Sequence, residues 1–224
     1  MFFIALEILL RLSLKMQEFL KELQQTFAEQ AKLYDVLPLD PRFSERMDPS
    51  LRVSGKPVSR WDYFGNNVWL PEPIGPKLYP RAHVVSADLQ IPKGGAEGVV
   101  TCVGAFSCGW SLYVKDSRPI FHYTFFDIAD VTIQGTETLP EGKVNLRTEF
   151  VPDGTPVGSG TLRMFVNGQA AGEGKVRRSG FRHGLEPFEV GRDSITPIDP
   201  AYKDRGAFPF TGTIEKITFE LTRK

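Results

Sequence analysis

The chain opens with a long segment in which hydrophobic residues recur at helical spacing. Residues 2–34 contain neither proline nor glycine, and apolar positions return every three or four residues. This pattern predicts an amphipathic α-helix, which we place at residues 1–37. Its apolar stripe consists of Leu6, Leu10, Leu20, Leu23, Phe27, Ala31 and Tyr34. The first half of the helix carries further hydrophobic residues on its other faces, so we expect residues 1–34 to be covered by a partner or by self-association.

The pattern changes at residue 38, where a proline-rich stretch begins. Proline disfavours helix at the preceding residue and cannot continue one. Residues 38–80 contain many prolines together with aromatic residues such as Trp61 and Trp69. We therefore predict an extended, irregular segment that packs on the following domain through its aromatic side chains.

From residue 81 onward, apolar and polar residues alternate in short runs. Val85–Ile91 alternates strictly, as a half-buried strand does. Turn signals separate the runs, and Asn167-Gly168 suits a tight hairpin because both residues tolerate positive φ. The pattern predicts a mainly β chain in which residues 81–224 form an antiparallel β-sandwich, with a barrel as the alternative.

Composition and charge narrow the class of protein. Lys and Arg number 27, as do Asp and Glu, so the formal net charge is zero and nucleic acid is not the expected partner. Hydrophobic residues make up 41% and charged residues 24%, as in soluble globular proteins. The apolar start of the chain is interrupted by Glu7 and Arg11 and is too short for a membrane span. We expect a soluble protein with no membrane span and no signal peptide, and its compartment is left open.

A series of motifs then carries a family resemblance over roughly residues 16–224. In chain order the motifs are Leu20–Gln24, Tyr34–Asp40, Gly94–Val99, Gly109–Asp116, Val190–Asp193 and Phe208–Lys216. The series resembles the C-terminal region of bacterial arylsulfatases, which implies a concanavalin A-like or laminin-G-like jelly roll. Neither Cys102 nor Cys108 begins the C-x-P-x-R motif that supplies a sulfatase nucleophile. The resemblance therefore implies a non-catalytic accessory domain that docks on a sulfatase catalytic domain, with no catalytic residue in this chain.

Two other functions stay open beside that one. A lectin-like carbohydrate-binding module would use aromatic platforms for sugar faces and arginine for sulfate. The residues that fit this description are Trp61, Trp69, Tyr113, Tyr123, Arg163, Arg177, Arg178 and Arg182. A glycosidase or lyase of the same fold would need two carboxylates about 5 Å apart. Neither Glu215 with Glu220 nor Asp127 with Asp130 matches the usual motif for such a pair.

The loop-rich stretch near the C-terminus contains a candidate metal site. Asp193, Asp199 and Asp204 fall within residues 191–206, and carboxylate oxygens are suitable ligands for calcium. Turn and capping chemistry is the alternative role for these aspartates. Calcium is the one cofactor that the sequence suggests.

The two cysteines lie at equal distances from Ala105. If a hairpin were centred there, Cys102 and Cys108 would face each other and could form a cross-strand disulfide. The alternative is that both are small buried hydrophobic residues.

Overall fold

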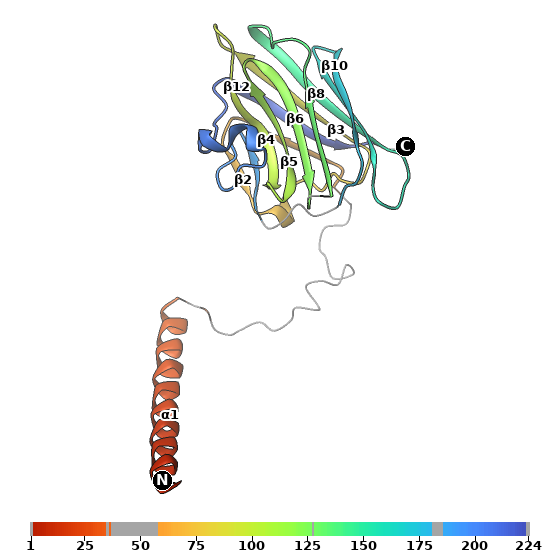
Figure 1. Cartoon of the computed structure of the whole chain (residues 1–224). Helices are drawn as coiled ribbons and strands as arrows, with labels where there is room; N and C mark the ends of the chain where they lie inside the picture. The colour runs from red at the N-terminus through yellow and green to blue at the C-terminus, as the bar shows by residue number, and fades with distance from the viewer. Residues whose placement is uncertain (1, 35, 37–57, 127, 181–185, 223–224) are drawn as a thin grey trace. The chain divides into compact units, whose positions relative to one another are not determined.

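The computed structural model describes residues 2–34, 36, 58–126, 128–180 and 186–222 (Figure 1). The chain divides into two compact units, Met1–Pro57 and Val58–Lys224. The first contains the helix and the second contains the sandwich.

The predicted N-terminal helix is α1, Phe2–Leu33. Its absence of proline and glycine lets the backbone ladder run for 32 residues without a break. At its end the Val36 amide donates to the carbonyl of Ala31, at 2.8 Å. Within the part of the chain that the structure describes, no helix has the length and hydrophobicity needed to cross a membrane.

The second unit is a sandwich of two antiparallel sheets with six strands each, which confirms the predicted fold (Figure 1). Sheet A has the order β1-β12-β3-β8-β9-β10, with β1 Arg60–Tyr63, β12 Thr213–Leu221, β3 His83–Ile91, β8 Gly142–Pro152, β9 Gly160–Val166 and β10 Gln169–Val176. Sheet B has the order β2-β11-β4-β5-β6-β7, with β2 Val68–Leu70, β11 Phe188–Val190, β4 Gly98–Ala105, β5 Cys108–Lys115, β6 Arg118–Phe125 and β7 Ala129–Gln134. Two short 3₁₀ helices, Glu72–Ile74 and Pro200–Arg205, complete the elements.

The main core fills the space between the sheets. Alternation along β3 and β8 sends every second side chain inward, among them Leu89, Leu146 and Phe150, all of which are buried. From sheet B, Leu112 and Phe121 meet them. Burying a side chain of this size stabilises the fold by roughly 1.5–3 kcal/mol, so the core supplies most of the favourable free energy.

The outer face of sheet B is covered by residues 191–212, which we call the cover segment. It includes the 3₁₀ helix Pro200–Arg205, and its Phe208 carbonyl accepts a hydrogen bond from the Val99 amide at 2.9 Å. Under it lies a second hydrophobic cluster, made of Val99, Cys102, Tyr113, Ile120, Ile198, Tyr202 and Phe208. Because both faces of sheet B are covered, β4 is buried along its whole length and β5 along all but its last residue.

Two strands come from the proline-rich stretch, which was predicted to pack on the sandwich as an irregular segment. β1 pairs with β12 at one edge of sheet A, and β2 pairs with β11 at one edge of sheet B. The predicted extended segment at residues 38–80 thus supplies an edge strand to each sheet from its second half, while residues 38–57 lie outside the described residues.

The hairpin between β4 and β5 separates the two cysteines, so the alternative of two small buried residues describes them and the possible disulfide does not form. The turn lies at Phe106 and Ser107, so Ala105 pairs with Cys108 and Cys102 pairs with Ser111. Cys102 and Cys108 are therefore on opposite faces of sheet B, and both remain thiols.

The hairpin predicted at Asn167-Gly168 is confirmed. Both residues adopt positive φ, 49° and 80°, in the turn that joins β9 to β10.

Candidate functional site

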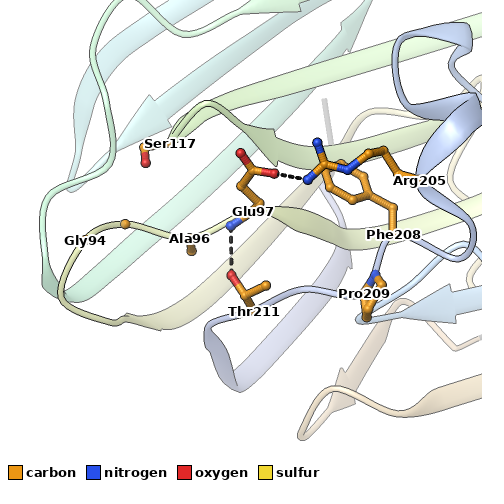
Figure 2. Close-up of a pocket in the computed structure, with 9 residues that line it drawn as sticks. Gly94, Ala96, Glu97, Ser117, Arg205, Phe208, Pro209 and Thr211 are labelled. Carbon is orange, nitrogen blue, oxygen red and sulfur yellow. Dashed lines mark hydrogen bonds and ion pairs between the residues drawn. The ribbon is translucent and has the colours of Figure 1, made fainter.

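A pocket of about 380 Å³ opens at the end of the sandwich where three loops meet (Figure 2). The loops are the β3–β4 connection, the β5–β6 turn and the second half of the cover segment. The lining residues are Gly94, Gly95, Ala96, Glu97, Ser117, Arg205, Phe208, Pro209 and Thr211. The volume lies at the lower end of the range of about 300–1,000 Å³ that is typical of small-molecule sites.

Glycines bring the β3–β4 loop close to the neighbouring turn. Gly94 and Gly95 have φ of +86° and +93°, a region that other residues rarely adopt. A Cβ at Gly95 would lie 2.1 Å from the Ser117 hydroxyl, so only glycine allows this approach. The Gly94 amide also donates to a carboxylate oxygen of Glu141 at 2.9 Å, which holds the loop in place.

The polar groups of the pocket come from Glu97, Arg205 and Thr211 (Figure 2). The Arg205 guanidinium forms an ion pair with the Glu97 carboxylate and lies 4.9 Å above the centre of the Phe208 ring. The Glu97 amide donates to the Thr211 hydroxyl at 2.9 Å, and the Thr211 amide donates to the Glu97 carbonyl at 2.8 Å. These backbone contacts fix both side chains at the mouth of the pocket.

The ion pair is open to solvent, with 49% of the Arg205 side chain and 32% of the Glu97 side chain exposed. An exposed pair of this kind contributes little to stability, so its partners can exchange for ligand groups at small cost. Arginine offers several N–H donors in a planar fork, and the carboxylate accepts hydrogen bonds from hydroxyl groups. The pocket therefore presents donors and acceptors side by side, as recognition of a polyhydroxylated ligand requires.

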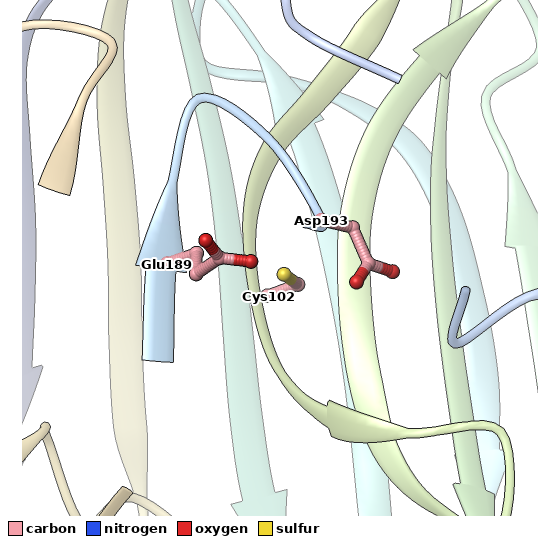
Figure 3. Close-up of side chains that lie close together, drawn as sticks. All are labelled: Cys102, Glu189 and Asp193. Carbon is pink, nitrogen blue, oxygen red and sulfur yellow. The ribbon is translucent and has the colours of Figure 1, made fainter. Parts of the chain in front are cut away.

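A second group of functional side chains is buried beneath the cover segment (Figure 3). Cys102, Glu189 and Asp193 place one ligand atom each within 4.8 Å of one another, the one such set among the described residues. Thiolate and carboxylate groups are ligands for divalent metals such as zinc. This cluster is the place in the described chain where residue types and spacing come nearest to a metal site.

The hydrogen bonds of this cluster give it a structural role. Glu189 accepts from the backbone amide and hydroxyl of Ser194 at 2.6 and 2.7 Å. Asp193 accepts from the Tyr202 hydroxyl at 2.7 Å and from the Ile198 amide at 3.0 Å. Burial raises the pKa of Asp193 to about 6. The Glu189 bonds tie the cover segment to β11 of sheet B, and the Asp193 bonds hold the cover segment together internally. Together they account for the buried carboxylates without a metal ion.

Burial also raises the pKa of the Cys102 thiol well above its ordinary value. The thiol lies 3.4 Å from the Arg192 carbonyl, to which it donates. A neutral, buried thiol is a poor nucleophile, which is consistent with its place in the hydrophobic cluster.

The three aspartates predicted to bind calcium are not brought together. Asp199 accepts from the Tyr113 hydroxyl at 2.7 Å and caps the 3₁₀ helix through the Ala201 amide at 2.8 Å. Asp193 belongs to the buried cluster described above, and Asp204 is exposed on the 3₁₀ helix. The alternative role, turn and capping chemistry, describes Asp199 correctly.

The aromatic residues predicted as sugar platforms differ in exposure. Tyr113 and Tyr123 are fully buried, so neither offers a ring face to a ligand. Trp61 is partly buried against the main core, and Trp69 is about half exposed on β2. Tyr113 lies on the face of sheet B that the cover segment hides, where alternation alone assigns a side chain to solvent, and Tyr123 belongs to the main core between the sheets.

The predicted arginines are also away from the pocket. Arg163 forms an ion pair with Glu173, at 2.6 Å, on the outer face of sheet A. Arg177 is exposed and Arg178 is half-buried just after β10, while Arg182 lies outside the described residues. None of the predicted residues that the structure describes lines the pocket.

Sequence reasoning missed Glu97, Ser117, Arg205 and Thr211 as pocket residues. These residues lie in three loops that together span more than 90 positions of the sequence, and the fold brings the loops next to one another. The available signal was the Gly94-Gly95 pair, since consecutive glycines mark a close backbone approach.

Comparison with known proteins bears on the fold. No protein-family model and no curated protein matches the chain. A mutant of the NanB sialidase from Streptococcus pneumoniae matches in structure with a TM-score of 0.52 and 12% identity, over 75% of this chain and 27% of that one. The IT-sialidase CBM40 of Ruminococcus gnavus, bound to α2,3-sialyllactose, gives a TM-score of 0.48 and 11% identity, over 73% and 94%. Mouse laminin α1 domains LG4-5 give a TM-score of 0.46 and 14% identity, over 70% and 39%.

Identities this low establish a shared fold alone. The chain has a concanavalin A-like β-sandwich of the jelly-roll type in one unit and a long N-terminal helix in the other. The matched sialidase structure is not an arylsulfatase, so the link that the motif order implies stays a prediction.

Proposed function

We propose that this protein is a carbohydrate-binding module that holds a glycan in the pocket of residues 94–97, 117 and 205–211. The observation that supports the proposal most directly is the solvent-open pair of Arg205 and Glu97 at the mouth of the 380 Å³ pocket. Sugar hydroxyls both donate and accept hydrogen bonds. In this ion pair the Arg205 guanidinium is a donor and the adjacent Glu97 carboxylate is an acceptor.

The lining also favours binding over hydrolysis. A retaining glycosidase places two carboxylates about 5 Å apart. Glu97 is the single carboxylate among the residues that line the pocket, and the remaining polar side chains are the guanidinium of Arg205 and the hydroxyls of Ser117 and Thr211. These groups hold and orient a ligand.

Arg205 makes an anionic substituent on the glycan a good match. A sulfate or carboxylate can take the place of the Glu97 carboxylate in a bidentate contact with the guanidinium. Because the displaced Glu97 is exposed, its charge can be solvated by water. The proposal therefore covers neutral glycans and prefers acidic ones.

Docking on a sulfatase catalytic domain is the second candidate function. One observation favours it: two motifs of the arylsulfatase resemblance, Gly94–Val99 and Phe208–Lys216, include most of the residues that line the pocket. Co-expression with a sulfatase catalytic domain, followed by size exclusion, tests this role, and separate elution contradicts it.

The main proposal is tested by screening the full chain on a glycan array, with and without calcium, and by calorimetry on the glycans that bind. Hydrogen bonds to a charged group contribute about 1.5–3 kcal/mol, so Arg205→Ala is expected to weaken binding roughly 10- to 100-fold. Arg163→Ala is a matched control because its side chain is equally exposed, at 49%, and equally ion-paired. A blank array in both conditions, or equal affinity of Arg205→Ala and wild type, overturns the proposal.

A further inference from the structure

The helix α1 carries a hydrophobic pattern that is stricter than amphipathicity requires. Spacings of four and three residues alternate over ten positions: Phe2, Leu6, Leu9, Ser13, Met16, Leu20, Leu23, Phe27, Gln30 and Tyr34. Eight of these ten residues are hydrophobic, and the pattern persists for more than four repeats of seven. A repeat of 3.5 residues drifts by about 20° per heptad around a straight helix, so it stays on one seam only when helices wind around each other.

From Ser13 onward the side chains on this seam are exposed. In the second half of α1, Met16 is 65% exposed, Leu20 54%, Leu23 50% and Phe27 53%. Covering each of them would stabilise the protein by roughly 1.5–3 kcal/mol. An isolated helix of this length gains little from its own backbone bonds, so packing along the seam is the available source of stability.

A second copy of this chain is the occupant that the helix fits. Arg and Lys number four within α1 and Glu numbers four, so two copies do not repel each other. None of these charges lies at a seam position. A seven-residue repeat interlocks only with another helix of the same repeat, which a copy supplies.

The two polar seam residues specify how the copies pair. In a parallel arrangement in register, Ser13 meets Ser13 and Gln30 meets Gln30, and each pair can hydrogen-bond across the seam. An antiparallel arrangement that sets Ser13 against Gln30 also pairs the two polar groups, but it leaves Phe2 and Leu6 beyond the end of the partner helix. Other registers place Ser13 and Gln30 against hydrophobic side chains, which leaves their hydrogen bonds unmade. We infer that the chain self-associates through α1 as a parallel, in-register coiled coil.

For the proposed carbohydrate-binding function, on which this consequence rests, self-association matters through avidity. Parallel helices end side by side, so the chains of one assembly continue from the same end and the assembly carries several glycan pockets. Linked sites of this kind strengthen binding to a multivalent surface by about 10²–10⁴-fold without any new contact. A glycan that one pocket holds weakly is then held firmly by the assembly.

The first test is the mass of the full chain in solution, by sedimentation equilibrium. Wild type is expected at twice 25.1 kDa or a higher whole multiple of it. Leu20→Lys, on the seam, is expected to raise the dissociation constant at least 100-fold, because it buries a charge where leucine packed. Leu14→Lys makes the same exchange one position off the seam, at a residue 59% exposed, and is expected to keep the wild-type mass.

Two further measurements make each outcome decisive. Gln30→Cys is expected to form a disulfide-linked dimer under oxidation only if the helices are parallel and in register, so failure to cross-link overturns the geometry. A monomeric wild type at 100 μM overturns the inference, as does equal dissociation of the two lysine variants. Binding of a monomer to vesicles of neutral and anionic lipid would assign the seam to a membrane surface instead.

The glycan measurements separate this inference from the proposed function. Calorimetry with a monovalent glycan reports on the pocket alone and is expected to give the same affinity for wild type and Leu20→Lys. Retention on a glycan-coated surface is expected to fall at least 100-fold for Leu20→Lys. Loss of monovalent binding contradicts the pocket, whereas equal retention of the two proteins contradicts the avidity.

Discussion

Lowering the pH from 7 to 5 is expected to destabilise the sandwich through one histidine of β3. His83 is buried, with its ring centre 4.7 Å from that of Tyr79 and 5.3 Å from that of Phe150. Its Nδ1 lies 2.7 Å from the Arg81 carbonyl, so we assign the proton to Nδ1 as donor. Burial lowers the pKa of His83 to about 4, because the charged ring would lose its hydration.

The size of the effect follows from proton linkage. In the unfolded chain a histidine titrates near pH 6.5, so between pH 6.5 and 4 the unfolded state binds more protons than the native state. The neutral His83 ring therefore makes its full contribution to the free energy of unfolding above pH 6.5, and this contribution is lost as the pH falls toward 4. For a pKa of about 4 in the folded protein, the loss between pH 7 and 5 is about 2 kcal/mol.

Asp193 works in the opposite direction over the same range. Burial raises its pKa to about 6 from an ordinary value of 3.8, so its native form holds a proton that the unfolded chain releases. Its contribution to stability is lost as the pH rises through 3.8 to 6, and lowering the pH from 7 to 5 regains about 1 kcal/mol. The wild-type change is the small difference of the two effects, which is why single variants are needed.

The assay is urea unfolding of wild type, His83→Phe and Asp193→Asn at pH 7 and pH 5. The three tryptophans, Trp61, Trp69 and Trp110, all lie in the sandwich, so their fluorescence reports on this unit. Relative to wild type, His83→Phe is expected to gain about 2 kcal/mol in free energy of unfolding on going to pH 5. Asp193→Asn is expected to lose about 1 kcal/mol. Any constant offset from a lost hydrogen bond cancels between the two pH values, so an offset of His83→Phe that does not change with pH refutes the reasoning.

Three further predictions concern the sandwich. Gly98 has φ +112°, and a Cβ there would lie 2.2 Å from a carbonyl oxygen of the cover segment. Gly98→Ala is therefore expected to lower the free energy of unfolding by roughly 3 kcal/mol in urea titrations. The control Gly154→Ala, at φ +81° with open space around the new Cβ, is expected to lower it by about 1 kcal/mol. Tyr113→Phe removes the donor to Asp199 and is expected to cost about 2 kcal/mol by the same assay; a loss below 0.5 kcal/mol would show that the hydrogen bond is dispensable. The thiol of Cys102 is expected not to react with a disulfide reagent at pH 8 in the native protein and to react fully in guanidinium, whereas rapid native labelling would contradict its burial.

The sequence predicted the architecture well where one face of a strand is buried. Along Val85–Ile91 the alternation matches β3, because the outer face of sheet A is open and polar residues point there. Along Trp110–Lys115 the same reading predicts an exposed Tyr113, yet the cover segment buries it. A residue's partner more than 80 positions away, such as Asp199 for Tyr113, leaves no trace in local periodicity.

The pocket could not be predicted for a related reason. Glu97 and Arg205 are more than 100 positions apart and are ordinary charged residues in turn-rich stretches. Their meeting depends on the path of the cover segment across sheet B, which no pattern of the 191–212 sequence specifies. Aromatic residues and arginines on strands are easy to see in a sequence as candidate sugar contacts, whereas the pocket is built from loops.

The edge strands of the two sheets affect whether a self-associating protein of this kind aggregates. At one margin the edge strands β1 and β2 have only four and three residues. At the other margin the sheets converge so closely that a Cβ at Gly174 would lie 2.6 Å from Ile133 of β7. Long free strand edges recruit one another into fibres, and crowding speeds that recruitment. Short or converging sheet edges leave little backbone to extend, so sandwiches brought to high local concentration can stay separate and keep their loop ends free for ligand.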